Sequence, residues 1–503
     1  MNFKKLLAGT MAATMLLSVG LAGCSNPGSD NASSAAGDQS QTQSQEPSNE
    51  TVNLIYYTIG DPDNDLANVN TALNELLKEK INVTIQYNKI AWGDYGTKIS
   101  SLVNSGSAFD VAFATGPDQG DYVGNSRKGA WLPLDDYLKE GAIGADMGKA
   151  INPVLLEGVK IDGVTYGIPS NKEVAVPDWW MYPKELVDKY KINIKDYKTL
   201  ESLEPLLKNI KENETDWLPM ELNKNAHNYF AIDGYEWVID RTCPLMVKSD
   251  DKDLKIVNIF ETDLAKSTLE TLHKYYEAGY INEDAAVSDV ENLVKDKKTF
   301  WKCAGGGVGA ETSWSNDRGY DVVANQVTPS VVTTESSRGG IMCVNKLTKN
   351  PDAAVKFLNA LNTDAEVRNM MNYGVEGKNY NLVDGQVEVI PDTYAGVQYT
   401  QGNWFILKTR VGQDKDLWDQ FQAFNSEAKK SEALGFTPDK TKIDNQLAAI
   451  ATVVGKYYAG LMTGTTDPAT ELPKFQQELK DAGVDTVMEE LQNQITAWKA
   501  AQK

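Results

Sequence analysis

Two hydrophobic periods alternate along the first part of the folded chain. Residues 52–57 form a short apolar run with β propensity, and residues 83–87 alternate apolar and polar side chains as a half-buried strand does. Between these runs, apolar side chains recur at helical spacing, at Leu66, Val69, Leu73, Leu76 and Leu77. A further helical face precedes a compact apolar strand at residues 110–114; its members are Tyr95, Ile99, Leu102 and Val103. This β-α-β-α-β order predicts an α/β fold in which helices cover a parallel sheet.

The loop after the third predicted strand is a candidate for ligand contact. Its sequence is Thr115-Gly116-Pro117-Asp118. In open parallel sheets, ligands bind at the loops that follow the carboxyl ends of the strands. Asp118 is the acidic residue of such a loop.

Helix boundaries are also clear in the second half of the chain. Asn350-Pro351 places a capping side chain before a proline at the first helical position. Residues 363–366 have the spacing of a capping box. One C-terminal helical stripe is formed by Val484, Val487, Met488, Leu491, Ile495 and Trp498. We expect these apolar faces to pack into a core.

The N-terminus has the layout of a secretory signal. A small positive head precedes an apolar stretch, residues 6–21, that is too short and too rich in alanine and glycine for a comfortable membrane span. Leu21-Ala22-Gly23-Cys24 resembles the lipobox of bacterial lipoproteins, in which the cysteine receives lipid and becomes the new N-terminus. The alternative is an ordinary signal peptide with an incidental cysteine. The prediction is a signal peptide at 1–23 and a lipid anchor on Cys24 that holds the protein to the outer face of the cell membrane.

The segment after Cys24 is typical of a tether. Residues 25–50 are almost all small or polar, so they cannot bury enough surface to offset chain entropy. We expect a disordered tether at 24–50 and an ordered body that begins near Thr51.

Composition limits the kinds of partner and site. The chain has 49 Lys and Arg against 70 Asp and Glu, a formal charge of −21, so it has no bulk attraction for nucleic acid. Besides Cys24, the cysteines are Cys243, Cys303 and Cys343, which allow at most one disulfide. With only two histidines, His227 and His273, a zinc site or a Ser-His-Asp triad is poorly supplied. We expect no cofactor and no metal.

Tryptophans beside polar or loop-forming residues are the main chemical signal. Such tryptophans occur at Trp92, Trp179, Trp180, Trp301, Trp314 and Trp404. Aromatic faces with nearby Asp, Asn, Glu and Arg suit sugar rings, although each of these side chains could instead turn inward to pack. We assign Trp131 to the core. The glycine-rich run 305–309 lacks the Lys-Ser/Thr of a phosphate-binding loop and indicates close approach to the backbone.

Several stretches, in order, resemble the extracellular solute-binding proteins of ABC importers, in the broad sugar-binding family. The C-terminal stretch from Leu434 onward resembles the domain of unknown function DUF3502, which marks a narrower subfamily. The stretches that carry the resemblance are Ala130–Asp135, Gly163–Pro169, Trp180–Leu186, Asn350–Leu361, Met371–Asp384 and Leu434–Lys503.

The resemblance implies a two-lobed, type II periplasmic-binding-protein-like fold with a ligand cleft between the lobes. We place crossovers near Asn171, near Pro329 and at 362–373. Lobe one is then 51–170 plus 330–361, and lobe two is 171–329 plus 362–503. Binding implies hinge closure, and the closed form is what the membrane subunits of an importer recognise.

The resulting prediction is a lipid-anchored, monomeric protein that binds an oligosaccharide and is not an enzyme. The predicted binding residues are Trp92, Asp118, Asn171, Glu173, Trp180, Trp314, Arg338, Glu376, Asn403 and Trp404. Two alternatives remain open. A peptide- or amino-acid-binding lipoprotein would rely on charged anchors, and a secreted glycosidase would need paired carboxylates.

Overall fold

The computed structural model describes residues 50–289 and 298–502. The predicted signal peptide, Cys24 and nearly all of the predicted tether lie outside the described residues. None of the helices in the described ranges is long and apolar enough to cross a membrane.

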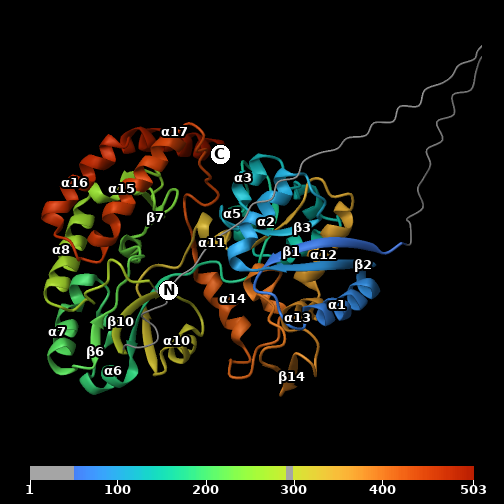
Figure 1. The fold of residues 1–503 in the computed structure, drawn as a ribbon, viewed down its shortest axis with the longest axis horizontal. Coiled ribbons are helices and arrows are strands. Elements are labelled where there is room, and N and C mark those ends of the chain that lie inside the picture. Colours follow the sequence, from blue (N-terminus) through green and yellow to red (C-terminus); the bar gives the residue numbers. More distant parts are fainter. Residues whose placement is uncertain (1–49, 290–297, 503) are drawn as a thin grey trace, which may run out of the picture. The chain divides into compact units, whose positions relative to one another are not determined.

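A five-stranded sheet is built mainly from the N-terminal part of the body. Its strand order is β2-β1-β3-β13-β4, with β1 parallel to both β2 and β3, and β13 antiparallel to β3 and β4. The strands are β1 (Val52–Ile59), β2 (Val83–Ile90), β3 (Val111–Ala114), β4 (Gly167–Pro169) and β13 (Ile341–Val344). Helices α1 (Leu66–Ile81) and α2 (Trp92–Asn104) connect the parallel strands, which confirms the predicted β-α-β-α-β order (Figure 1).

Helices α12 (Pro351–Thr363) and α13 (Ala365–Tyr373) pack with α1 against this first sheet. Val367 and Met371 of α13 lie in the same buried cluster as Leu54 of β1 and Leu73 of α1. The position of α13 therefore differs from the prediction, which assigned residues 362–503 to the second lobe. Trp131 is fully buried in a neighbouring cluster, as predicted.

A four-stranded mixed sheet forms the second part of the body. Its order is β11-β5-β10-β6, with β10 antiparallel to β5 and parallel to β6. The strands are β5 (Asp178–Pro183), β6 (Trp217–Met220), β10 (Lys298–Gly305) and β11 (Val322–Gln326). The associated helices are α6 (Lys184–Tyr190), α7 (Glu204–Asn213), α8 (Asp263–Glu277) and α10 (Ala310–Arg318).

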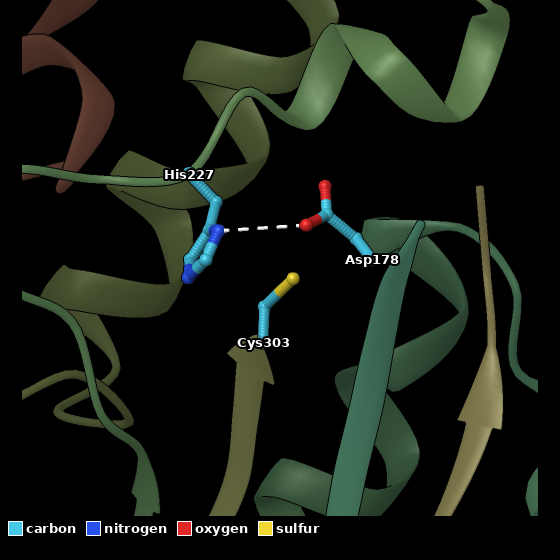
Figure 2. Close-up of side chains that lie close together, drawn as sticks. All are labelled: Asp178, His227 and Cys303. Carbon is cyan, nitrogen blue, oxygen red and sulfur yellow. Dashed lines mark ion pairs between the residues drawn. The ribbon is translucent and has the colours of Figure 1, made fainter. Parts of the chain in front are cut away.

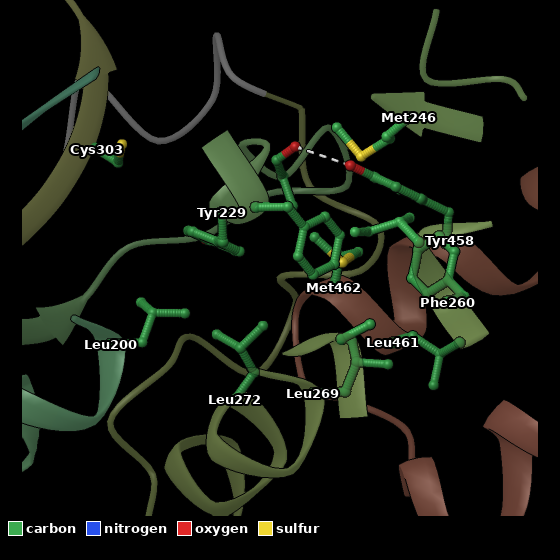
Figure 3. Close-up of a cluster of buried hydrophobic side chains, with 14 of the residues drawn as sticks. Leu200, Tyr229, Met246, Phe260, Leu269, Leu272, Cys303, Tyr458, Leu461 and Met462 are labelled. Atoms are coloured by element: carbon green, nitrogen blue, oxygen red, sulfur yellow. Dashed lines mark hydrogen bonds between the residues drawn. The ribbon is translucent and has the colours of Figure 1, made fainter. Parts of the chain in front are cut away.

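The C-terminal helices extend the core of this second sheet. Helix α8 packs against α15 (Asp444–Met462) and α16 (Pro468–Asp481), and α17 (Val484–Ala501) follows them (Figure 1). Figure 3 shows Phe260 and Tyr458 inside this cluster, where the Tyr458 hydroxyl donates to the carbonyl of Ala226 over 3.4 Å. The predicted C-terminal stripe is buried here at Val484, Val487, Leu491 and Ile495, while Met488 and Trp498 pack at its margin.

Shorter elements complete the described structure. The remaining strands are β7 (Tyr235–Trp237), β8 (Leu245–Lys248), β9 (Val257–Asn258), β12 (Val331–Val332), β14 (Tyr380–Val383), β15 (Gln386–Val389) and β16 (Lys429–Lys430). The remaining α-helices are α3 (Tyr122–Arg127), α4 (Ala145–Ala150), α5 (Pro153–Gly158), α11 (Thr334–Ser337) and α14 (Leu417–Glu427). Three short 3-10 helices border the candidate site: η4 (Tyr229–Asp233), η6 (Gln398–Thr400) and η7 (Trp404–Ile406).

Within residues 50–289 and 298–502, the chain passes between the two sheets at three places. It leaves the first sheet after β4, through the segment that contains Asn171, and returns between β11 and β13. The third passage lies at residues 428–433, where β16 pairs in parallel with β12. The prediction placed this passage at 362–373, but those residues form the end of α12 and the buried helix α13.

Candidate functional site

Two asparagines tie together segments that are distant in the sequence. The Asn171 amide nitrogen Nδ2 donates to Oδ1 of Asn403 over 3.1 Å and to the carbonyl of Ala150 over 3.0 Å. Oδ1 of Asn171 accepts from the backbone N–H of Asn152. The backbones of Asn171 and Asn403 also form a parallel bridge. Since both side chains are buried and already bonded within the chain, they position the neighbouring residues and have little capacity left for a ligand.

The next two residues carry an ion pair with an unused oxygen. Lys172 Nζ contacts Oε1 of Glu173 and lies 5.8 Å from the centre of the Trp404 ring. Among the described residues, the buried Oε2 of Glu173 has no hydrogen-bond partner. A buried polar atom without a partner costs free energy, so this carboxylate oxygen is suited to accept a hydrogen bond from a ligand hydroxyl.

Trp404 lies in an aromatic cluster with helix α14. Its ring centre is 6.3 Å from Trp418 and 6.3 Å from Phe421, both in edge-to-face geometry. Its Nε1 donates to the carbonyl of Gln398 over 3.0 Å, which fixes the orientation of the half-buried indole. The sequence analysis named Trp404 but not its two α14 partners, although Trp418 also follows a polar segment, residues 412–416.

Trp92 forms a second, more exposed aromatic surface. It starts α2 and stacks on Tyr399 of η6 with ring centres 6.0 Å apart and planes 22° apart. Trp92 is 39 % exposed and Tyr399 is 36 % exposed. Because Gln398 precedes Tyr399 and holds the Trp404 indole, the two aromatic groups are linked through one short segment. Asp118 is exposed near the same helix, and a Cβ on Gly96, one turn after Trp92, would lie 2.2 Å from the Asp118 carbonyl oxygen.

The glycine-rich run connects β10 to α10 and admits close contacts, as predicted. A Cβ at Gly306 would lie 2.6 Å from the ring of Trp314, so only glycine allows that ring to cover the backbone. A Cβ at Gly307 would lie 3.8 Å from Phe421 and from Phe424, which places the run beside α14. Trp314 thus covers the glycine-rich run 305–309, and this run lies beside the aromatic side chains of α14.

Three of the predicted binding residues do not join the group formed by Glu173, Trp404 and Trp92. Trp180 is fully buried and contacts Trp301 edge-to-face at 5.4 Å, so it offers no ring face to a sugar. The Arg338 guanidinium donates to the carbonyls of Gly158 and Lys160 and to Oγ1 of Thr437, as a structural tie does. Glu376 is exposed before the β14–β15 hairpin and forms a backbone bridge with Tyr380, and no contact joins its side chain to Glu173, Trp404 or Trp92 in the described residues. The polar context of Trp180 in the sequence did not reveal that its strand is central in a sheet.

A cluster of three potential metal ligands lies at the start of β5. Figure 2 shows Asp178, His227 and Cys303 facing one another, with Nδ1 of His227 3.7 Å from Oδ1 of Asp178. One ligand atom from each residue lies within 4.8 Å of the others. Partial burial raises the pKa of Asp178 and lowers that of the half-exposed His227, because the surrounding protein removes part of the hydration of both charged forms. The sequence missed this cluster because its members are far apart along the chain and form no local motif.

Comparisons with known proteins agree with the fold. The family model described as bacterial extracellular solute-binding protein matches residues 71–377, and the domain of unknown function DUF3502 matches residues 432–500. The chain is 29 % identical, over 98 % of both chains, to a carbohydrate ABC transporter substrate-binding protein of Streptococcus pneumoniae serotype 4.

Solved structures show the same architecture. A crystal structure of the N-glycan transport solute-binding protein NgtS from Streptococcus pneumoniae has a TM-score of 0.79 at 29 % identity, covering 90 % of this chain and 100 % of that one. NgtS in complex with Man1GlcNAc has a TM-score of 0.70 at 28 % identity, covering 89 % of this chain and 99 % of that one. The fold is that of the two-lobed solute-binding proteins, and because the family model matches more than half of its length, this chain belongs to the bacterial extracellular solute-binding protein family.

Proposed function

We propose that this protein captures an oligosaccharide outside the cytoplasm and delivers it to an ABC importer. The observation that carries the proposal is the exposed, stacked pair of Trp92 and Tyr399. Such a pair presents an apolar platform for the C–H face of a sugar ring. The carbohydrate-transport relatives named above support the same class of ligand.

The polar groups beside the aromatic surfaces suit hydroxyl recognition. Oε2 of Glu173 offers a desolvated acceptor, and Lys172 holds the other carboxylate oxygen in place. The Lys172–Glu173 pair follows Asn171 directly, so the hydrogen bonds of Asn171 restrict where that carboxylate lies. A rigid acceptor next to an aromatic face loses little conformational freedom on binding, which favours affinity.

Hinge closure is the expected response to the ligand. The candidate residues lie on the first sheet side (Trp92, Asp118), on the passage after β4 (Glu173) and on the run after β10 (residues 305–309). A ligand that contacts all of them stabilises a closed arrangement over an open one. The TM-scores of 0.79 and 0.70 with two NgtS structures at nearly equal identity support a fold that adopts more than one arrangement.

Anchoring through Cys24 is part of the same proposal. A lipid on Cys24 and a polar tether at 24–50 would keep a monomeric receptor near the membrane subunits of its importer. Metabolic labelling with a fatty-acid probe tests the anchor: we expect label on the parent protein and none on Cys24→Ser. Equal labelling of both would contradict the lipobox interpretation.

Calorimetry on the mature chain, residues 24–503 with Cys24→Ser, tests the ligand class. We expect saturable binding to a member of a panel of mannose- and N-acetylglucosamine-containing oligosaccharides, and no binding to a peptide panel. Chromatography of the incubated sugar should show no products, because we propose capture without turnover. Binding to peptides alone, or cleavage of the bound sugar, would favour one of the two alternatives.

A further inference from the structure

Asp178, His227 and Cys303 come together through sheet register and one loop. In the antiparallel β5–β10 pair, Cys303 lies opposite Trp180, and Asp178 lies two residues before Trp180. Side chains two residues apart on a strand share a face, so Asp178 and Cys303 are diagonal neighbours on one face of the sheet. His227, in the segment before η4, reaches the same face (Figure 2).

The three side chains form a suitable donor set for a borderline-soft metal ion. Zinc binds thiolate sulfur at about 2.3 Å and imidazole nitrogen or carboxylate oxygen at about 2.0–2.2 Å, so donors in a zinc tetrahedron lie roughly 3.3–3.6 Å apart. The His227–Asp178 separation of 3.7 Å is close to that spacing, and all three ligand atoms lie within 4.8 Å of one another. Coordination would draw the three donor atoms closer together than they lie here.

The surroundings of the cluster distinguish it from ordinary core packing. The imidazole of His227 is 38 % exposed, so an ion can reach the site from solvent. The side chain of Cys303 is buried at 3 % exposure, and its sulfur lies beside the donor atoms of Asp178 and His227. In the described ranges, Cys243 and Cys343 have no comparable set of donors around them.

We propose that Asp178, His227 and Cys303 bind one Zn²⁺ ion, with an open position for water or a fourth ligand. The low number of histidines predicted no metal, since the three donors come together only in the folded chain. The ion would tie the first residue of β5 to the end of β10, directly before the glycine-rich run. Asp178 is already held there by a hydrogen bond from its N–H to Oγ1 of Thr328 over 2.7 Å, and Gly306 donates to the carbonyl of Pro177 over 3.0 Å. The proposal does not depend on the identity of the sugar ligand.

Metal titration of the mature chain (residues 24–503, Cys24→Ser) tests the proposal. After treatment with chelator, we expect one equivalent of Zn²⁺ to bind in calorimetry and to raise the melting temperature by several degrees. Co²⁺ used as a probe should give the absorption bands of tetrahedral coordination, including a sulfur-to-cobalt charge-transfer band.

Matched variants separate this site from adventitious binding. Cys303→Ser should abolish the charge-transfer band, and His227→Ala should weaken Zn²⁺ binding by roughly tenfold or more because it removes a direct ligand. Cys343→Ser, at another buried cysteine, and His273→Ala should leave both signals unchanged. His227 is partly exposed, so its variant keeps the test available if Cys303→Ser fails to fold. No Zn²⁺ binding by the parent, or equal binding by the His227→Ala variant, would overturn the proposal.

Discussion

The pair Trp92–Tyr399 and the pair Trp180–Trp301 use similar side chains for opposite purposes. Trp92 and Tyr399 stack at the surface, at the start of a helix and in a short 3-10 helix. Trp180 and Trp301 meet edge-to-face on adjacent central strands and have no exposed surface. Both Trp92 and Trp180 stand next to loop-forming or polar residues in the sequence. The difference shows that a tryptophan can meet a ligand only if the helix or strand that carries it leaves the ring uncovered by the rest of the fold.

The largest expected effect is on the buried pair. Trp180→Ala should lower the free energy of unfolding by about 3–5 kcal/mol, since it empties a large volume in the second core. Chemical denaturation followed by circular dichroism measures this loss. Trp131→Ala, at the fully buried tryptophan near the first sheet, is the matched control and should lose a similar amount. A Trp180→Ala variant as stable as the parent would return this residue to the list of binding candidates.

The exposed pair should show the reverse behaviour. Trp92→Ala should weaken oligosaccharide binding by about 1–3 kcal/mol while the melting temperature changes little, because the lost contact is with the ligand. Calorimetry gives the affinity and a thermal scan gives the stability. Val411→Ala changes another exposed hydrophobic residue and serves as the control. Normal binding by both Trp92→Ala and Tyr399→Ala would remove the aromatic platform from the proposed site.

Two glutamates extend the comparison between the two tryptophan pairs to charged groups. Among the described residues, Oε2 of Glu173 and Oε2 of Glu236 are both buried without a hydrogen-bond partner. Burial raises the pKa of Glu236 to about 7, although the hydrogen bond from Ser431 opposes the shift. The pKa of Glu236 is higher in the folded protein than its value near 4.5 in the unfolded chain. Its contribution to folding stability is therefore fully present below about pH 4.5 and is lost as the pH rises through about 7.

Glu236→Gln should therefore flatten the pH dependence of stability. We expect the loss of unfolding free energy between about pH 4.5 and pH 8 to shrink by roughly 1–3 kcal/mol relative to the parent. Urea denaturation at several pH values measures it. An unchanged slope would show that Glu236 is hydrated in solution. Asp233→Asn, at an exposed residue in the neighbouring η4, is the control.

The smallest expected effect concerns Glu173. Glu173→Gln keeps the shape of the side chain but weakens the acceptor, so oligosaccharide binding should weaken by about 0.5–1.5 kcal/mol. Calorimetry measures this change, and Glu140→Gln, at an exposed glutamate that the binding proposal does not use, is the control. Equal affinities for the parent and Glu173→Gln would mean that the free carboxylate oxygen does not contact the sugar.

Local patterns predicted the regular elements well and the site only in part. The alternation of residues 83–87 corresponds to β2, and the helical spacing of Leu66 to Leu77 corresponds to α1. Both were predictable because an element that buries one face repeats its apolar residues with the period of that element. The structure joins Asn171, Asn403 and Trp404 by hydrogen bonds, and their contact with a ligand stays a prediction. The division of lobes at 362–503 differed because nothing local shows that α13 packs on the first sheet.

The sequence by itself determined the α/β pattern and the family, because these depend on residues close together in the chain or on the order of short motifs. The secretory layout of the N-terminus stays a prediction. The tertiary structure decided which tryptophans face solvent, which carboxylate oxygens lack partners, and which cysteine meets a histidine and an aspartate. The physical reason is that these properties depend on contacts between residues such as Asp178 and Cys303, whose proximity is set by strand pairing. The distance between two residues along the sequence therefore does not predict whether strand pairing will bring them together.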